Sequence, residues 1–96
     1  MTRFFMFGKY SHEALSGISA SRTDKVIALI KQNGGELQSM YTLLGQFDLV
    51  IIVDFPSLEQ VLKTSVALQK LTGISFSTSP VVEVAEFDEL VGTEEQ

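Results

Sequence analysis

The most hydrophobic run of the chain, residues 49–53, follows a turn signal at Gly45-Gln46 and precedes Pro56. Short apolar runs bounded by turn residues indicate strands that are buried on both faces. Residues 3–9 have the same character, because large apolar side chains stand at successive positions and so point to opposite sides of a strand. Strands that need apolar cover on both sides belong in the centre of a sheet. The chain is therefore expected to fold around these two.

Two further segments have the pattern of amphipathic helices. In the first, Ser21 is the expected N-cap and Gly34-Gly35 marks the end. In the second, Ser57 and Gln60 match the S-x-x-Q capping box, and the helix should end near Gly73.

The remaining strands are expected at the edges of the sheet. Residues 36–44 should pair with 47–54 through a two-residue turn, and residues 74–84 contain Pro80, which is unfavourable in a central strand. The order β-α-β-β-α-β matches the ferredoxin-like α+β fold. That fold has a four-stranded antiparallel sheet in the order 4-1-3-2, with two helices on one face and right-handed crossovers.

Two helices can cover only one face of such a sheet, yet both central strands carry apolar side chains on the other face as well. A typical monomer exposes no more than roughly a few hundred Å² of continuous apolar surface. Pairing two uncovered faces gives a dimeric α+β barrel with an isologous interface. The expected partner is therefore the chain itself, as a homodimer or a higher homo-oligomer.

Composition narrows the functional classes. The 96 residues, 45% of them hydrophobic, suit one domain over residues 1–96, with an acidic C-terminal tail over about residues 88–96. With no Cys and one His, no metal and no cofactor are expected. No apolar run is long enough to span a membrane. We expect a cytoplasmic protein that does not associate with membranes.

Charge is distributed unevenly along the chain. The net charge is −5, but residues 1–82 carry seven basic and six acidic side chains, and the other six acids lie in residues 83–96. No basic stripe interleaved with aromatic residues is present, so nucleic acid is not an expected partner. The acidic end either keeps a tail solvated or docks a partner.

Several polar residues are expected to meet at one end of the sheet. Tyr10 and His12 leave the first strand at the end where the hairpin turns, and Arg22 lies in the first turn of the first helix. The predicted register puts Tyr41 and Asp48 on one face, looking into a cavity shared with a second copy. A concave apolar cavity with a few polar groups is the usual form of a small-molecule site. Tyr10, Arg22, Tyr41 and Asp48 are therefore the candidate ligand-binding residues.

Each candidate also has a structural interpretation. Asp48 either accepts hydrogen bonds from backbone N–H groups or pairs with Arg22, or it is a carboxylate with a raised pKa that acts as a base. Arg22 is either a paired first-turn residue or an anion clamp at the helix N-terminus. His12 is either an ordinary exposed histidine or a general base. The two tyrosines are either half-buried packing groups or ligand contacts. Asp48 and His12 are thus the only candidate catalytic residues.

The order and spacing of these residues resemble those of the small bacterial GYD-domain family. The residues that carry the resemblance are the aromatic-rich first strand, Tyr10, Arg22, Gly34-Gly35, Tyr41, the tetrad from Gly45 to Asp48, and Gly73. The resemblance implies a ferredoxin-like fold of the dimeric α+β barrel type. Phe47 stands where the family has its namesake tyrosine, so a mechanism that needs that hydroxyl does not carry over. The predicted register directs Phe47 under the helices.

Three classes of function are compatible with this sequence. The first is an oligomeric small-ligand-binding or sensor domain with a polar site at the end of the barrel. The second is a cofactor-independent enzyme, monooxygenase-like or isomerase-like, by fold analogy with dimeric α+β barrels. The third is a structural or adaptor subunit that docks a partner through its acidic C-terminus.

Overall fold

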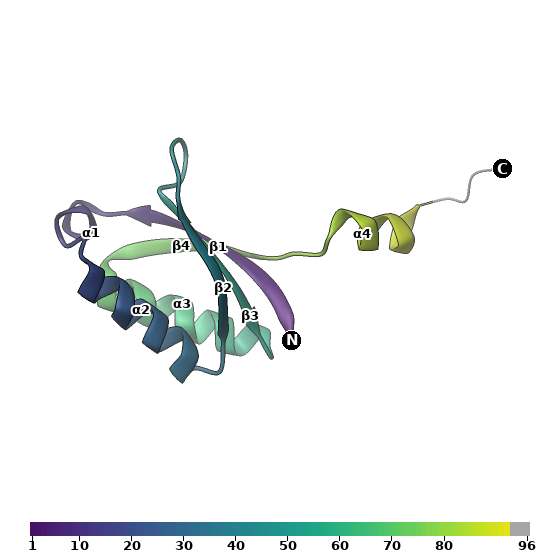
Figure 1. The fold of residues 1–96 in the computed structure, drawn as a ribbon, viewed down its shortest axis with the longest axis horizontal. Helices are drawn as coiled ribbons and strands as arrows, with labels where there is room; N and C mark the ends of the chain where they lie inside the picture. Colours follow the sequence, from purple (N-terminus) through teal and green to yellow (C-terminus); the bar gives the residue numbers. More distant parts are fainter. Residues whose placement is uncertain (93–96) are drawn as a thin grey trace.

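Four strands form one antiparallel sheet in the computed structural model, which describes residues 1–92 (Figure 1). The central strands are β1 (Thr2–Tyr10) and β3 (Leu49–Phe55), and the edge strands are β2 (Glu36–Thr42) and β4 (Ile74–Pro80). Their order, β2-β3-β1-β4, is the order 4-1-3-2 predicted from the sequence. The ferredoxin-like α+β fold is thereby confirmed.

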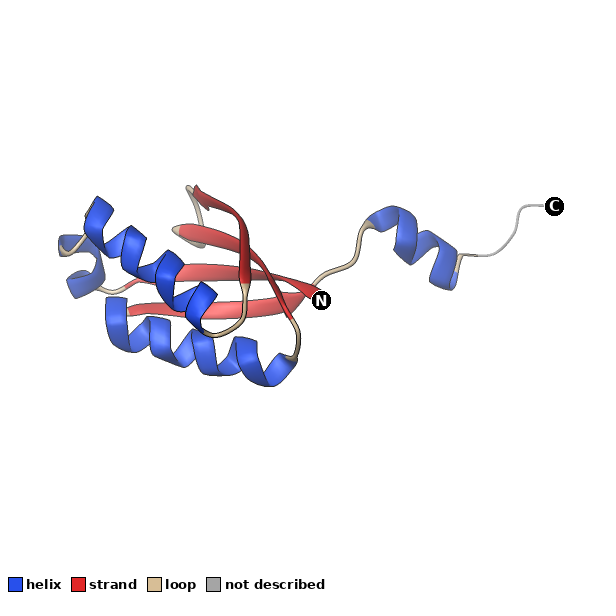
Figure 2. Ribbon diagram, turned by 60° about the horizontal axis from the view of Figure 1, so that its bottom comes forward, coloured by secondary structure: helices blue, strands red, loops and turns tan. Residues whose placement is uncertain are grey.

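The two long helices, α2 (Ala20–Gln32) and α3 (Leu58–Thr72), cover the same face of the sheet (Figure 2). Between helices and sheet lies a core in which Met6, Ile30, Ile51 and Leu68 are fully buried. β1 and β3 contribute alternate residues to this core, because successive side chains of a strand point to opposite faces.

The helix caps set where each helix begins. Ser57 caps α3 as predicted, accepting a hydrogen bond from the backbone N–H of Gln60 at 3.3 Å. The prediction of Ser21 as the cap of α2 is wrong, because Ser19 accepts from the backbone N–H of Arg22 at 3.0 Å. Ser21 is the second residue of α2, and the spacing of apolar residues fixes the buried face of the helix without fixing its first residue.

The serine-rich connection after β1 contains a short helix, α1 (His12–Ser16), capped by Ser11. The buried side chain of Ala14 holds α1 against the domain. Gly73, in the left-handed conformation at φ +78°, ends α3 beside this helix. A Cβ on Gly73 would lie 2.9 Å from the Ser11 hydroxyl, so glycine is needed there for backbone geometry and for space.

The β2–β3 hairpin has the predicted register, with Tyr41 opposite Val50. The N–H of Leu43 also donates to the carbonyl of Asp48 at 2.9 Å, which extends the register beyond the strands. The strands are shorter than predicted, since residues 43–48 lie outside both of them. The predicted direction of Phe47 is wrong: its ring lies 5.3 Å from that of Phe7, on the face away from the helices.

The C-terminal segment departs most from expectation. The last strand does not reach residue 84 but ends at Pro80, and a further helix, α4 (Val84–Val91), follows. α4 stands apart from the sheet as an arm (Figures 1 and 2). It replaces the first part of the predicted acidic tail, whose residues 93–96 lie outside the described residues. Within residues 1–92 no helix has the length and hydrophobicity to cross a bilayer.

Two buried threonines provide a test of the junction between α3 and β4. Thr64 donates to the Gln60 carbonyl at 2.7 Å, whereas Thr72 both donates to Leu68 at 2.7 Å and accepts from the N–H of Ile74 at 3.0 Å. Thr72→Val should lower the free energy of unfolding by about 1–3 kcal/mol, because a buried N–H loses its acceptor. The matched Thr64→Val change should cost less in urea unfolding. Equal losses would contradict this role of Thr72.

The Arg3–Asp54 ion pair should make stability depend on acid pH. Arg3 and Gln38 both donate to the Asp54 carboxylate, and the Arg3 hydrogen bond in particular holds the pKa of Asp54 below its ordinary value. The contribution of this pair is therefore complete above the ordinary Asp pKa of about 4 and is lost as pH falls through the lower folded-state value. Asp54→Asn should lower the urea midpoint at neutral pH and have a smaller effect near pH ~2. An equal effect at both pH values would argue against this linkage, and Asp24→Asn on α2 is the control.

Candidate functional site

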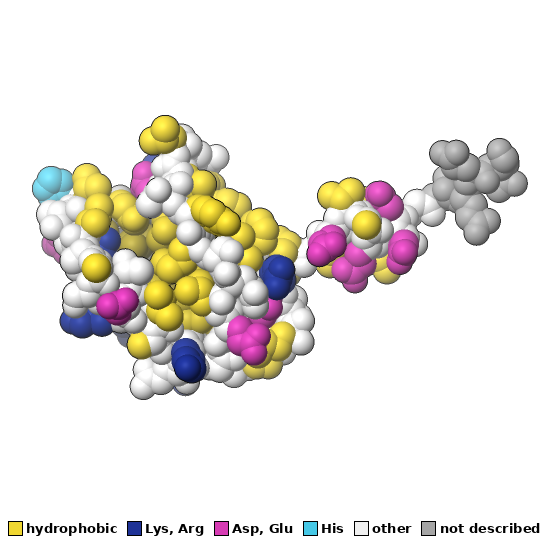
Figure 3. Space-filling model, viewed as in Figure 1, with side chains coloured by type: hydrophobic (Ala, Val, Ile, Leu, Met, Phe, Trp, Pro, Cys, Tyr) yellow, Lys and Arg dark blue, Asp and Glu magenta, His cyan; other side chains and the backbone are white. Residues whose placement is uncertain are grey.

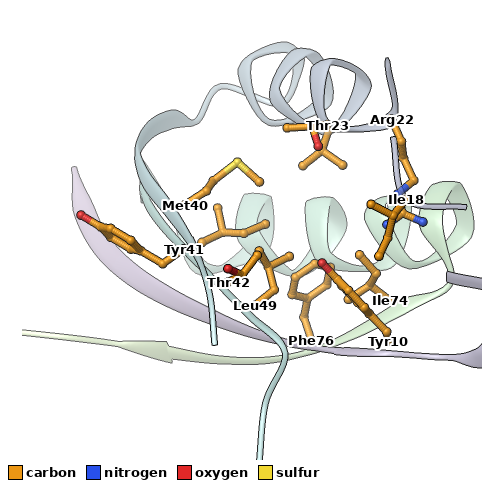
Figure 4. A pocket seen from close by; sticks show the side chains of 12 residues that line it. Tyr10, Ile18, Arg22, Thr23, Met40, Tyr41, Thr42, Leu49, Ile74 and Phe76 are labelled. Carbon is orange, nitrogen blue, oxygen red and sulfur yellow. The ribbon is translucent and has the colours of Figure 1, made fainter. Parts of the chain in front are cut away.

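A pocket of about 230 Å³ lies between the first half of α2 and the helix-covered face of the sheet (Figure 4). Hydrophobic side chains gather in this hollow between α2 and the β2–β3 hairpin (Figure 3). Its walls and floor are apolar, and come from Val26 on α2 and from Met40, Leu49, Ile51, Ile74 and Phe76 on the sheet. Hydroxyl groups and one guanidinium stand around the opening.

Gly8 shapes the floor of the pocket from β1. Its position faces the helices, but it has no side chain, and a Cβ there would lie 2.9 Å from Ile74 and 3.0 Å from Phe76. Both side chains therefore rest directly against the β1 backbone. The close approach is possible only with glycine at this position.

Tyr10 is the polar group that points into the pocket. Its hydroxyl is directed toward the middle of the hollow (Figure 4), and it makes no hydrogen bond within residues 1–92. The guanidinium carbon of Arg22 lies 5.8 Å from the centre of the Tyr10 ring. One Arg22 nitrogen donates to the carbonyl of Ala14, so Arg22 bridges α1 and α2 at the mouth of the pocket.

Asp48 lies next to the pocket without lining it. Its carboxylate accepts a hydrogen bond from the backbone N–H of Tyr10 at 2.9 Å, and its own N–H donates to the Gly8 carbonyl at 2.9 Å. Asp48 thus holds the end of β1 where Tyr10 enters the pocket. The ion pair with Arg22 is not formed among the described residues. Of the interpretations open for Asp48, the backbone contact is the one that the structure contains.

The other two candidates lie at different distances from the pocket. Tyr41 contributes to the outer edge, but it is 57% exposed and its ring turns away from the hollow (Figure 4). His12 is exposed at the start of α1 and does not line the pocket. No group of three or more His, Cys, Asp or Glu residues that could hold a metal ion occurs in residues 1–92.

The structure brings Tyr10, Arg22 and Tyr41 to the lining of one pocket, which lies on the face opposite to the one that the sequence favoured. Tyr41 itself pairs with Val50, which belongs to the face away from the helices. Thr23 and Thr42 also stand at the opening and were not predicted. Strand alternation could have found Thr42, since it pairs with Leu49, which faces the core. Thr23 follows Arg22 in the first turn of α2, and nothing in its sequence context distinguishes it.

The family model for the GYD domain matches residues 4–91, nearly the whole chain. The chain belongs to the GYD-domain family. The match includes the strands and helices around the pocket and extends to the last residue of α4. No curated protein matches this GYD-domain chain at a significant level.

Solved structures of other proteins resemble the fold of the GYD-domain chain. The Mycobacterium tuberculosis leucine response regulatory protein LrpA has 13% sequence identity and a TM-score of 0.57, with 86% of this chain and 51% of that chain covered. A point mutant of Rv3291c has 12% identity and a TM-score of 0.58, with 88% and 52% covered. The GYD-domain chain spans about half the length of these structures, and the likeness at this identity is one of fold alone.

Asp48 offers a test of how the pocket is held together. Asp48→Ala should lower the free energy of unfolding by about 1.5–3 kcal/mol, because the backbone N–H of Tyr10 loses a charged acceptor. Asp48→Asn, the matched control, keeps an oxygen acceptor and should lose less. Urea unfolding gives the free energies, and amide hydrogen exchange at Tyr10 reports the bond directly. Unchanged exchange in Asp48→Ala would contradict the assignment.

Proposed function

We propose that this GYD-domain chain is a small-ligand-binding or sensor subunit that works as a homo-oligomer and holds its ligand in the pocket under α2. The observation that carries the proposal is an apolar hollow into which the Tyr10 hydroxyl points and whose opening is bordered by the Arg22 guanidinium. Ligand sites in proteins commonly combine an apolar lining with a few polar groups that fix orientation.

The volume of the pocket limits the size of the ligand. An engineered apolar cavity of about 150 Å³ binds benzene, and drug-sized ligands occupy roughly 300–1,000 Å³. A pocket of about 230 Å³ therefore suits one ring or one branched aliphatic chain with a small polar group attached. Larger ligands would project past Tyr41 into solvent.

The polar rim favours a carboxylate or a similar acceptor as that group. Arg22 uses one nitrogen for the Ala14 carbonyl, and a guanidinium carries further N–H donors that suit a carboxylate. The Tyr10 hydroxyl supplies another donor, and the N-terminus of α2 adds positive potential on the same side. A small apolar monocarboxylate meets all three features.

The name of one structural neighbour suggests a probe of this class. That protein is called a leucine response regulatory protein, and leucine has a branched apolar chain beside a carboxylate. Leucine also falls in the size range that the pocket favours. It is a suitable first probe, together with 4-methylpentanoate, which lacks the amine, and benzoate, which has a ring.

We favour a ligand-binding function over an enzymatic one because of where the candidate catalytic residues lie. Asp48 is engaged with the Tyr10 backbone and does not line the pocket, and His12 is also outside it. The pocket therefore lacks both of the candidate catalytic residues, Asp48 and His12.

Native mass spectrometry of freshly purified protein tests the proposal first, because it reports oligomer size and any retained ligand together. Calorimetric titration with the three probes should then show binding to the wild-type chain. Arg22→Gln should weaken binding of a carboxylate probe by about 10-fold or more, because a charge-assisted hydrogen bond is lost. Lys25→Gln, on the same helix but outside the pocket lining, is the matched control.

Two results would overturn the proposal. One is the absence of both a retained ligand and measurable binding of every probe. The other is equal weakening by the Arg22 and Lys25 variants, which would indicate nonspecific attraction between charges. Thr23→Phe narrows the opening without removing charge, so loss of binding in that variant locates the probe under α2.

A further inference from the structure

The arm formed by α4 packs against no other element of residues 1–92. None of its eight residues is buried. Isolated helices shorter than about 12 residues are marginal in water, so a helix of this length depends on packing for its stability. Its apolar residues form one stripe, Val84, Phe87, Leu90 and Val91, each at least 53% exposed. A stripe of this kind is a contact surface.

The root of the arm, residues 81–83, leads from the end of β4 away from the domain. The N–H of Val81 donates to the Arg3 carbonyl at 3.0 Å, so the chain stays attached to β1 for one residue after β4 ends. The arm then continues outward, and the molecule is 57 Å long against 30 and 18 Å in its other dimensions. Figures 1 and 2 both show α4 clear of the sheet and of the other helices.

The second unpartnered surface is the face of the sheet away from the helices, which we call the open face. Phe5 and Phe7 of β1 lie there opposite Ile52 and Val50 of β3, and Phe47 packs on Phe7. The β4 border of this face is polar, because the serines at positions 75, 77 and 79 pair with β1 residues of the same face. The open face thus has an apolar centre and a hydroxyl-lined rim.

One continuous groove joins these two surfaces. It encloses about 1010 Å³ and is lined on one side by Phe5 and Ile52 of the open face. On the other side it is lined by Val82, in the segment that leads to the arm, and by Val84 of the arm. A partner that fills the groove therefore contacts the open face and the arm of the same chain together.

The two surfaces are also complementary in charge. α4 and the residue before it carry Glu83, Glu86, Asp88 and Glu89 and no basic side chain. The open face of β1 has a base at each end, Arg3 and Lys9, and Lys9 contacts only the Gln46 carbonyl. Arg3 is already paired with Asp54 of its own chain, so the positive charge that an acidic arm meets along β1 is that of Lys9.

From these features we infer that each chain lays α4 on the open face of a second copy, in a reciprocal exchange of arms. The apolar stripe of each arm then meets the apolar open face of the other copy, twice in one two-fold dimer, and the acids of each arm approach Lys9 of the other copy. An isologous interface needs self-complementary surfaces, and this chain carries both halves. The inference specifies how the proposed oligomer is built and does not depend on the ligand.

Removal of the arm tests the inference. Deletion of residues 83–96 keeps the Val81–Arg3 hydrogen bond and should weaken self-association by about 30-fold or more, the loss that follows truncation of one anchor residue at an interface. The double variant Phe87→Ser, Leu90→Ser should have a similar effect.

The matched control is the double variant Leu62→Ser, Val66→Ser, which removes comparable exposed side chains from the exposed side of α3. Sedimentation equilibrium measures all four proteins, and circular dichroism shows that each is folded.

Cross-linking in trans tests the contact itself. The chain has no Cys, so a chain with Leu90→Cys can be mixed with a tagged chain with Ser77→Cys, and a mixed disulfide reports arm on open face. Lys63→Cys on α3 replaces Ser77→Cys in the control mixture and should give no specific product. A monomeric wild-type chain would overturn both the oligomer and the exchange of arms. A dimer that survives the deletion and gives no cross-link would overturn only the exchange.

Discussion

The pairing of β1 with β3 at the centre of the sheet is the constraint on which the rest of the structure depends. The two strands are in register from Thr2 opposite Phe55 to Gly8 opposite Leu49. Because side chains alternate along both strands, this register fixes two apolar sets at once. One set, with Met6 and Ile51, forms the core under the helices. The other becomes the open face, which two helices on the opposite side cannot cover.

Most of the fold could be predicted because it follows from this distribution of apolar residues. Strands that are apolar on both faces belong in the centre, and serine-rich or proline-containing strands belong at the edge, which gives the order 4-1-3-2. The predictions failed where two patterns compete over a few residues. Residues 81–91 contain apolar positions that fit a strand continued past Pro80, but their spacing at 84, 87 and 91 is helical, and the helix is what forms.

Three of the predicted site residues line the pocket, but the position of the pocket was not predicted. Tyr10, Arg22 and Tyr41 do meet at the hairpin end of the sheet, because chain direction and strand order decide which residues share an end. The pocket itself depends on how far α2 stands from β2 and on the missing side chain of Gly8. Neither spacing nor hydropathy encodes such distances. The direction of Phe47 could not be predicted for a similar reason. Phe47 lies between β2 and β3, outside both strands, and its direction is set by packing on Phe7.

β1 connects the ligand pocket with the attachment point of the arm. Its last residue, Tyr10, enters the pocket, while Arg3 near its beginning holds the root of the arm. The strand between them is paired on both sides, to β3 and to β4. If a ligand at Tyr10 changed the strength of subunit association, association would change the affinity for that ligand by the same factor.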